Sequence, residues 1–242
     1  MTDTETETAE TATPIEAVIF DCDGVLIDSE TISGRIWAEE VARYGYTLTP
    51  QEFARRFAGR PAADTAKLIN QASPRKLPDD FARTTDEKVA ALYADELETV
   101  EGIEDLLASL AHLPIAVASS SGIPKLRQGL VVTNLMRTFH GHVYSAEQVA
   151  RGKPAPDLFL FAAEKLEIAP ARCAVIEDSI AGVHAAKSAG MIPIGFTGTA
   201  PEPDLHGKRL TQVGARLLVH RHADMMDALA SLDPQVRGLE PV

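Results

Sequence analysis

The sequence predicts an α/β fold with a doubly wound parallel sheet, in which an α-helical segment is inserted after the first strand. Short apolar runs recur along the chain and longer helical patterns separate them, an alternation typical of a parallel sheet covered by helices on both faces. The nearly one hundred residues between the first two apolar runs contain no convincing strand and are punctuated by prolines. They therefore predict a helical insertion.

The elements follow from these patterns in chain order. The predicted strands are the apolar runs Ala17–Phe20, Ile115–Ala118, His142–Tyr144, Cys173–Ile176, Ile192–Phe196 and Leu217–Val219. The helical patterns outside the insertion are Ile103–Ala111, Pro124–Val132, Pro156–Leu166, Ile180–Ala189 and Asp224–Leu232. Within the insertion they are roughly Glu30–Tyr44, Pro50–Phe57, Ala62–Gln71 and Asp79–Leu97. We expect the polar stretch His206–Thr211 to be a surface loop, and His220 and His222 to be surface residues.

The expected domains are a catalytic core of residues 14–29 and 98–242 and a helical cap of residues 30–97. A helical insertion placed directly after the first strand would hang over the carboxyl end of that strand as a lid. A helical domain unrelated to the site is the alternative. Residues 1–13 are rich in Thr and Glu and contain no apolar segment for a signal peptide, so we expect a disordered, solvated acidic tail.

The bulk composition limits the classes of partner. The formal net charge is -12, whereas nucleic-acid-binding proteins usually carry a basic face, and no apolar stretch approaches the length of a membrane span. The two cysteines, Cys22 and Cys173, lie in or beside apolar runs, which predicts small buried thiols and favours a reducing cytosol. We expect a cytoplasmic monomer that binds neither nucleic acid nor membranes.

The most informative stretch begins where the first apolar run stops at two carboxylates, Asp21 and Asp23, followed by Gly24. In a parallel sheet the carboxyl edge of the strands is where ligands bind. Two like charges this close repel unless a cation or a shared proton relieves them. A hairpin turn at Asp23-Gly24 would leave Asp21 unexplained, and a calcium loop needs a third ligand where Val25 stands. The pair therefore indicates a metal site.

Three further segments place polar or charged side chains at or near the ends of predicted strands. Ser119-Ser120-Ser121-Gly122 follows the second predicted strand, where hydroxyls and free N–H groups suit a phosphate, although a simple helix cap is the alternative. Lys153 is held between Gly152 and Pro154, outside any P-loop pattern. Glu177 and Asp178 end the fourth predicted strand. Carboxylates, hydroxyls and a lysine gathered at one edge of the sheet are the kinds of group that form an active site.

With these four segments the chain resembles the phosphohydrolases of the haloacid dehalogenase superfamily, in the subfamily with a helical cap after the first strand. The matching positions are Asp21-Cys22-Asp23-Gly24-Val25, Ser119, Lys153 within Gly-Lys-Pro-x-Pro-Asp, and Glu177-Asp178-Ser179. The resemblance spans Ile15 to about Leu232 and implies a Rossmann-like core.

The resemblance also implies a mechanism with an aspartyl-phosphate intermediate. Asp21 would attack phosphorus, and Asp23 would protonate the leaving oxygen and later deprotonate water. Proximity to Asp21 would raise the pKa of Asp23 until a metal binds. Mg²⁺ would be held by Asp21, the backbone carbonyl of Asp23 and Asp178, with help from Glu177. The residues expected to bind the phosphorylated substrate are Gly24, Ser119, Ser120 and Lys153, joined by the helical-segment residues Arg60 and Lys88.

The expected substrate is a small sugar phosphate or sugar-acid phosphate resembling 6-phosphogluconate. Sugar-phosphate mutases of the subfamily carry a histidine where this chain has Ser33, which argues against a mutase. A β-phosphoglucomutase-like enzyme and a phosphoglycolate-type phosphatase remain alternatives, as does a non-catalytic protein that binds phosphorylated ligands. A serine hydrolase built on Ser120 is disfavoured, because the nucleophile elbow needs a glycine where Ala118 stands.

Overall fold

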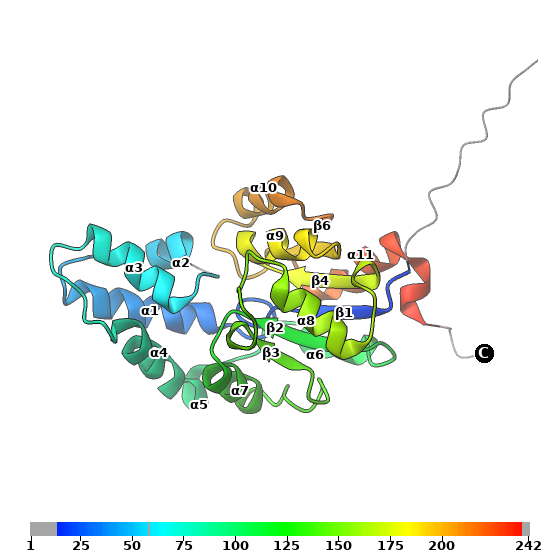
Figure 1. Cartoon of the computed structure of the whole chain (residues 1–242), viewed down its shortest axis with the longest axis horizontal. Coiled ribbons are helices and arrows are strands. Elements are labelled where there is room, and N and C mark those ends of the chain that lie inside the picture. Colours follow the sequence, from blue (N-terminus) through cyan, green and yellow to red (C-terminus); the bar gives the residue numbers. More distant parts are fainter. Residues whose placement is uncertain (1–13, 58, 239–242) are drawn as a thin grey trace, which may run out of the picture.

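The computed structural model describes residues 14–57 and 59–238, so the predicted tail of residues 1–13 lies outside the described residues. Its centre is a six-stranded sheet in the order β3-β2-β1-β4-β5-β6 (Figure 1). Every neighbouring pair is parallel, which confirms the predicted doubly wound sheet. The strands are β1 (Ala17–Phe20), β2 (Ile115–Ser119), β3 (Val143–Ser145), β4 (Cys173–Glu177), β5 (Ile192–Phe196) and β6 (Leu217–Val219).

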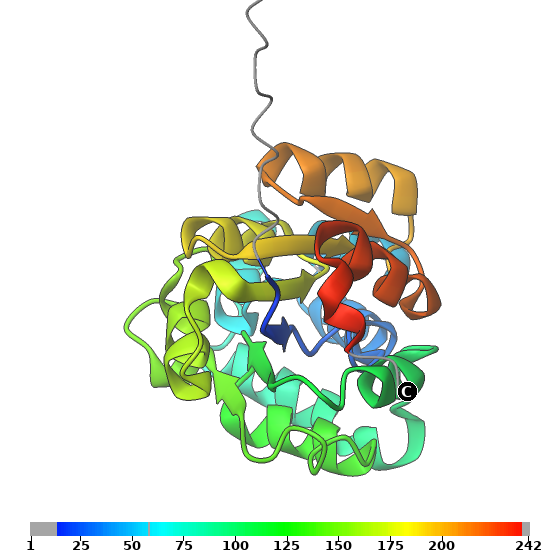
Figure 2. The ribbon, with the colours of Figure 1, turned by 90° about the vertical axis from the view of Figure 1, so that its right-hand side faces the viewer.

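Helices cover both faces of this sheet. Val18 and Phe20 of β1 join one apolar cluster, and Ala17 and Ile19 join another, because successive side chains of a strand point to opposite faces. The first cluster includes residues of α6 (Ile103–Ser109), α7 (Ile123–Val132) and α11 (Met225–Leu232), and the second includes residues of α8 (Asp157–Leu166) and α9 (Ile180–Ser188). Figure 2 shows α8, in yellow-green, and α11, in red, on opposite sides of the sheet.

The segment of residues 29–96, which lies between β1 and β2, is largely helical, as predicted, and gathers at one end of the sheet (Figure 1). Its helices are α1 (Ser29–Ala42), α2 (Pro50–Phe57), α3 (Ala62–Ala72), α4 (Phe81–Ala91) and α5 (Tyr93–Glu96). Trp37 is buried and packs against Phe53 and Phe81, with ring centroids 5.6 and 5.7 Å away. An aromatic cluster thus gives these helices a core of their own.

One predicted loop is wrong. Residues 206–211 lie within a helix, α10 (Pro203–Val213), followed by Gly214. Only Gly207 and Leu210 of this helix are buried, so it lacks the apolar stripe that reveals most surface helices. Proline at the first helical position and glycine just after the end were the signals available in the sequence.

The other differences are shifts of element ends. The third strand is displaced by one residue from the predicted 142–144, and the long fourth helix of the insertion is divided at Leu92 into α4 and α5. Short 3₁₀ turns complete the chain: η1 (Ala146–Gln148), η2 (Pro170–Arg172), η3 (His222–Asp224) and η4 (Pro234–Arg237). Both cysteines are free and buried, as expected. Across 14–57 and 59–238, no helix combines the length and the apolar character needed to cross a membrane.

The expectation that His222 is a surface residue is wrong. Its side chain is buried, stacks on Phe196 with ring centroids 4.2 Å apart, and donates from Nε2 to the carbonyl oxygen of Val25 at 2.8 Å. Its Nδ1 is buried without a hydrogen-bond partner among the described residues. Burial lowers the pKa of His222, although the bond to Val25 opposes this. His220, in contrast, is exposed.

A histidine kept neutral by the fold makes stability depend on pH. Below about pH 6.5 the unfolded chain takes up a proton that the folded protein does not. We therefore expect the stability advantage of the wild type over His222→Gln to shrink as the pH falls from 8 to 5.5, measured by thermal unfolding. The exposed His140 supplies the control variant His140→Gln, which measures the general effect of replacing a histidine by glutamine. A difference between wild type and His222→Gln that stays constant with pH would contradict this account.

Candidate active site

Strand register brings the predicted acids together. Residue Phe20 of β1 pairs with Val117 of β2 and with Ile176 of β4, and the Asp21 amide donates to the Ile176 carbonyl oxygen at 2.9 Å. The carboxyl ends of these three central strands therefore lie at one level. The strand order reverses between β1 and β4, and ligands of open α/β sheets bind at such a switch point.

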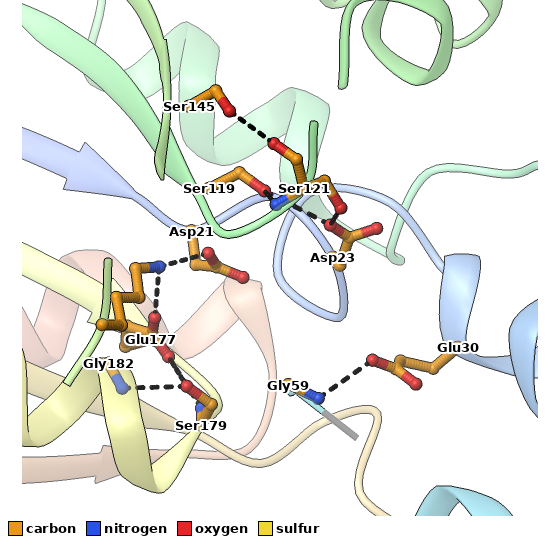
Figure 3. Close-up of polar contacts among 11 residues, drawn as sticks. Asp21, Asp23, Glu30, Gly59, Ser119, Ser121, Ser145, Glu177, Ser179 and Gly182 are labelled. Carbon is orange, nitrogen blue, oxygen red and sulfur yellow. Dashed lines mark hydrogen bonds and ion pairs between the residues drawn. The ribbon is translucent and has the colours of Figure 1, made fainter. Parts of the chain in front are cut away.

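Lys153 is the cation at the centre of this edge. Its ammonium lies 2.5 Å from Asp21 Oδ1 and 2.6 Å from Glu177 Oε1, and all three side chains are buried. The second oxygen of Glu177 accepts hydrogen bonds from the amide and hydroxyl of Ser179. Both carboxylate oxygens of Glu177 are thus engaged, and Glu177 fixes the lysine in place (Figure 3).

The negative charge around Lys153 exceeds what one ammonium can neutralise. One carboxylate oxygen from each of Asp21, Glu177 and Asp178 lies within 4.8 Å of the others. Burial raises the pKa of Asp21 to about 8, even though Lys153 opposes the shift, and burial raises the pKa of Asp178 well above its usual value. Asp178 Oδ1 is buried without a hydrogen-bond partner in the described part of the chain. An orphaned oxygen among carboxylates fits a hard divalent cation such as Mg²⁺, which prefers oxygen ligands.

Asp23 occupies a different environment, on the side of β2 (Figure 3). It accepts hydrogen bonds from three hydroxyls, those of Ser29 at 2.5 Å, Ser121 at 2.7 Å and Ser119 at 3.3 Å. Burial alone would raise its pKa, but the charge of Lys125 and the three hydroxyls outweigh burial and lower it. The expected upward shift of Asp23 is therefore wrong, and the raised pKa belongs to Asp21.

Gly24 serves the site through its backbone. It has φ +81°, a conformation that side chains disfavour, and a Cβ atom there would collide with the Asp178 carboxylate. Its carbonyl oxygen accepts a hydrogen bond from Thr199 at 2.9 Å. The glycine therefore lets the loop after β1 pass close to Asp178.

The structure separates the remaining predicted residues. Arg60 lines a cavity that also reaches Asp178, whereas Lys88 is not among the residues that line it. Lys88 instead pairs with Glu40 at 2.8 Å, between two helices of the insertion. Ser120 is half-buried, and its side chain makes no hydrogen bond with the described residues, unlike the hydroxyls of Ser119 and Ser121.

The structure adds residues that sequence reasoning did not assign to the site. Ser29 and Ser121 bond to Asp23, and Lys125 faces it while lying 3.8 Å from Asp86 of α4. The position of Ser29 soon after the two acids and the run of three serines were available signals. Lys125 had none, because a single lysine on a helix is normally a solvated surface residue.

Two contacts link the inserted segment and α10 to the acids. The Gly59 amide donates to Glu30 at 3.3 Å, so the loop between α2 and α3 reaches the start of α1 beside Asp23 (Figure 3). His206 donates from Nε2 to the backbone carbonyl oxygen of Asp178 at 2.5 Å. The contact of His206 was missed because residues 206–211 were expected to form a surface loop.

Comparison with known proteins agrees with this geometry. Residues 15–190 match the model of the haloacid dehalogenase-like hydrolases. The chain is 32% identical to the 6-phosphogluconate phosphatase of Escherichia coli K12, over 73% of this chain and 80% of that protein. It is 30% identical to the β-phosphoglucomutase of Bacillus subtilis 168, over 87% of this chain and 92% of that protein.

A solved structure shares the whole fold. The crystal structure of a hydrolase of the same family from Deinococcus radiodurans R1, with bound phosphate and sodium, superposes with a TM-score of 0.75 and 34% identity. The match covers 91% of this chain and 97% of that one. The chain therefore belongs to the haloacid dehalogenase-like hydrolases.

Proposed function

We propose that this hydrolase is a Mg²⁺-dependent phosphatase that releases phosphate from a small sugar phosphate or sugar-acid phosphate through an aspartyl-phosphate intermediate. The observation that carries the proposal is the buried set of Asp21, Asp178 and Glu177 around the single ammonium of Lys153. Such a set needs a further cation, and it places a carboxylate beside groups that attract a phosphate. The similarity to a 6-phosphogluconate phosphatase supports the choice of substrate class.

The residues that would hold Mg²⁺ are Asp21 and Asp178, together with the backbone carbonyl of Asp23. Glu177 would assist from its place beside Lys153. When bound, the ion would supply positive charge that favours the ionised form of the acids and lets a phosphate approach them. The pKa values of Asp21 and Asp178 are raised, so their ionised forms are destabilised in the folded protein when no such charge is present.

The side chains then have defined roles in the reaction. Lys153 and Ser119 bind phosphoryl oxygens, Asp21 attacks phosphorus, and the leaving oxygen departs on the side of Asp23. Asp23 must gain a proton before it can act as an acid, and the approaching phosphate favours this because a nearby anion raises a carboxyl pKa. In the second half of the reaction its ionised form accepts the proton of the attacking water. The inserted helices act as the cap that excludes bulk water.

The mutase remains the second candidate, because the chain is also similar to a β-phosphoglucomutase. The half-buried Ser33 of α1 stands where the resemblance places a histidine in such mutases. Net release of phosphate from a hexose phosphate supports the phosphatase, and isomerisation without release supports the mutase. A phosphoglycolate-type phosphatase is distinguished by the same substrate panel.

Binding of a cation should increase the thermal stability of the protein. We expect Mg²⁺ to raise the unfolding temperature of the wild type, corresponding to about 2.7 kcal/mol at a hundredfold excess over its dissociation constant. Asp178→Asn should be the more stable protein without the ion, because an amide needs no proton to stay uncharged beside Asp21 and Glu177, and it should lose the response to Mg²⁺. The exposed Asp204 gives the control, Asp204→Asn. Equal stabilisation of Asp178→Asn and wild type would refute the assignment.

Turnover should depend on the two acids to different degrees. We expect Asp21→Asn to reduce phosphate release by more than about a thousandfold, as removal of a nucleophile does, and a chelator to abolish it. Asp23→Asn should cost about a hundredfold to ten-thousandfold, the range of acid–base catalysis. Release of inorganic phosphate from a panel of sugar and sugar-acid phosphates measures both. Full activity of purified Asp21→Asn would reject the proposed mechanism.

A further inference from the structure

A cavity of about 640 Å³ opens beside the acid cluster. Residues of α2 and the loop after it, including Ala54, line the cavity together with residues of α9 and α10. Its lining includes Asp178 of the acid cluster and the neighbouring Ser179. In Figure 1, α2 and α10 flank the same side of the molecule. A space of this volume takes a small organic ligand rather than a phosphoryl group alone, so the body of a substrate can lie there.

The charge of this cavity is opposite to that of the protein. The whole chain carries a net charge of -12. The ionisable residues that line the cavity are Arg55, Arg56, Arg60, Arg209, His184 and His206, against Glu30, Asp178 and Glu202. The cavity is lined by four arginines and only three acids, although the protein as a whole is acidic. It therefore attracts anions locally.

Two of the four arginines are already engaged. Arg55 pairs with Glu202 at 3.9 Å, and Arg56 donates to the Tyr46 hydroxyl at 3.3 Å. The side chains of Arg60 and Arg209 make no ion pair or hydrogen bond with any residue of 14–57 and 59–238. These two cations, one from the loop after α2 and one from α10, are therefore the ones available to a ligand.

The position of Arg209 relative to the acids follows from α10. His206 donates to the backbone of Asp178, and Arg209 lies three residues later on the same helix, about 4.5 Å farther along the axis. Residues three apart share a helix face, and both line the cavity. Arg209 thus lies about one helical turn from a residue that contacts the acid cluster, and it lines the same cavity.

We propose that Arg209, with Arg60 from the loop after α2, binds a second anionic group at the end of the substrate remote from the ester. That group is a carboxylate or a second phosphate, both of which accept the paired N–H groups of arginine. The inference rests on the proposed phosphatase function and narrows its substrate class to phosphate esters with two anionic ends. It assigns a recognition role to the core helix α10 in addition to the inserted helices.

The test uses binding without turnover, measured by calorimetry on the full chain carrying Asp21→Asn with Mg²⁺ present. Two ligand pairs differ only in the second anion: 6-phosphogluconate against glucitol 6-phosphate, and fructose 1,6-bisphosphate against fructose 6-phosphate. In one pair we expect the doubly anionic ligand to bind about fivefold more tightly, the effect of a partly exposed ion pair. The pair that shows this preference identifies the anion as carboxylate or phosphate.

The added variant Arg209→Met should remove this preference and leave binding of the singly anionic ligand unchanged, whereas Arg209→Lys should keep part of it. Lys208→Met is the matched control, because Lys208 is exposed on the same helix and does not line the cavity. Equal binding within both pairs, or a preference that survives Arg209→Met, would overturn the proposal.

Phosphate release by the wild type from the same four compounds tests the phosphatase separately. Release without any preference that depends on Arg209 would overturn the second anion site and leave the phosphatase intact. A preference that depends on Arg209 in binding, without release of phosphate from any compound, would support the site and contradict the phosphatase.

Discussion

The candidate active site of this protein depends on one interaction, the contact of a buried ammonium with two carboxylates from neighbouring strands. Lys153 holds Asp21 and Glu177 at the switch point of the sheet. Removing ions from water is costly and is compensated only by close, well-bonded partners. Here the compensation is incomplete, since Asp178 adds a third carboxylate with an unpaired oxygen. The folded protein therefore has more carboxylates than Lys153 can neutralise, at the edge of the sheet where the proposed phosphate would bind.

The same loop gives two aspartates opposite electrostatic surroundings. Asp21 lies among acids, and its pKa rises to about 8, whereas Asp23 lies among hydroxyls near Lys125, and its pKa falls. Groups whose environments push their pKa values apart are the ones to which separate catalytic roles can be assigned. Gly24 makes this separation possible, because its backbone turns where a side chain would strike Asp178.

The sequence predicted the sheet because each central strand is apolar on both faces, as β1 shows with Val18 and Ile19 in different clusters. It predicted that the acids and Lys153 would lie close together, because the carboxyl ends of parallel strands meet at one edge of the sheet. It missed α10, whose exposed surface gives no periodic signal, and it misjudged His222, whose burial depends on the distant Phe196. The direction of the Asp23 pKa shift could not be predicted from the sequence either, because Ser29, Ser121 and Lys125 come from three separate segments.

The central claim is that one divalent cation is shared by Asp21 and Asp178 at the carboxyl edge of the sheet. Anomalous diffraction from crystals grown with Mn²⁺ in place of Mg²⁺ tests it most directly. The account predicts a single strong peak within ligand distance of both carboxylates and of the Asp23 carbonyl oxygen. A peak elsewhere in the molecule, with Asp21 and Asp178 free of metal at saturating Mn²⁺, would contradict it.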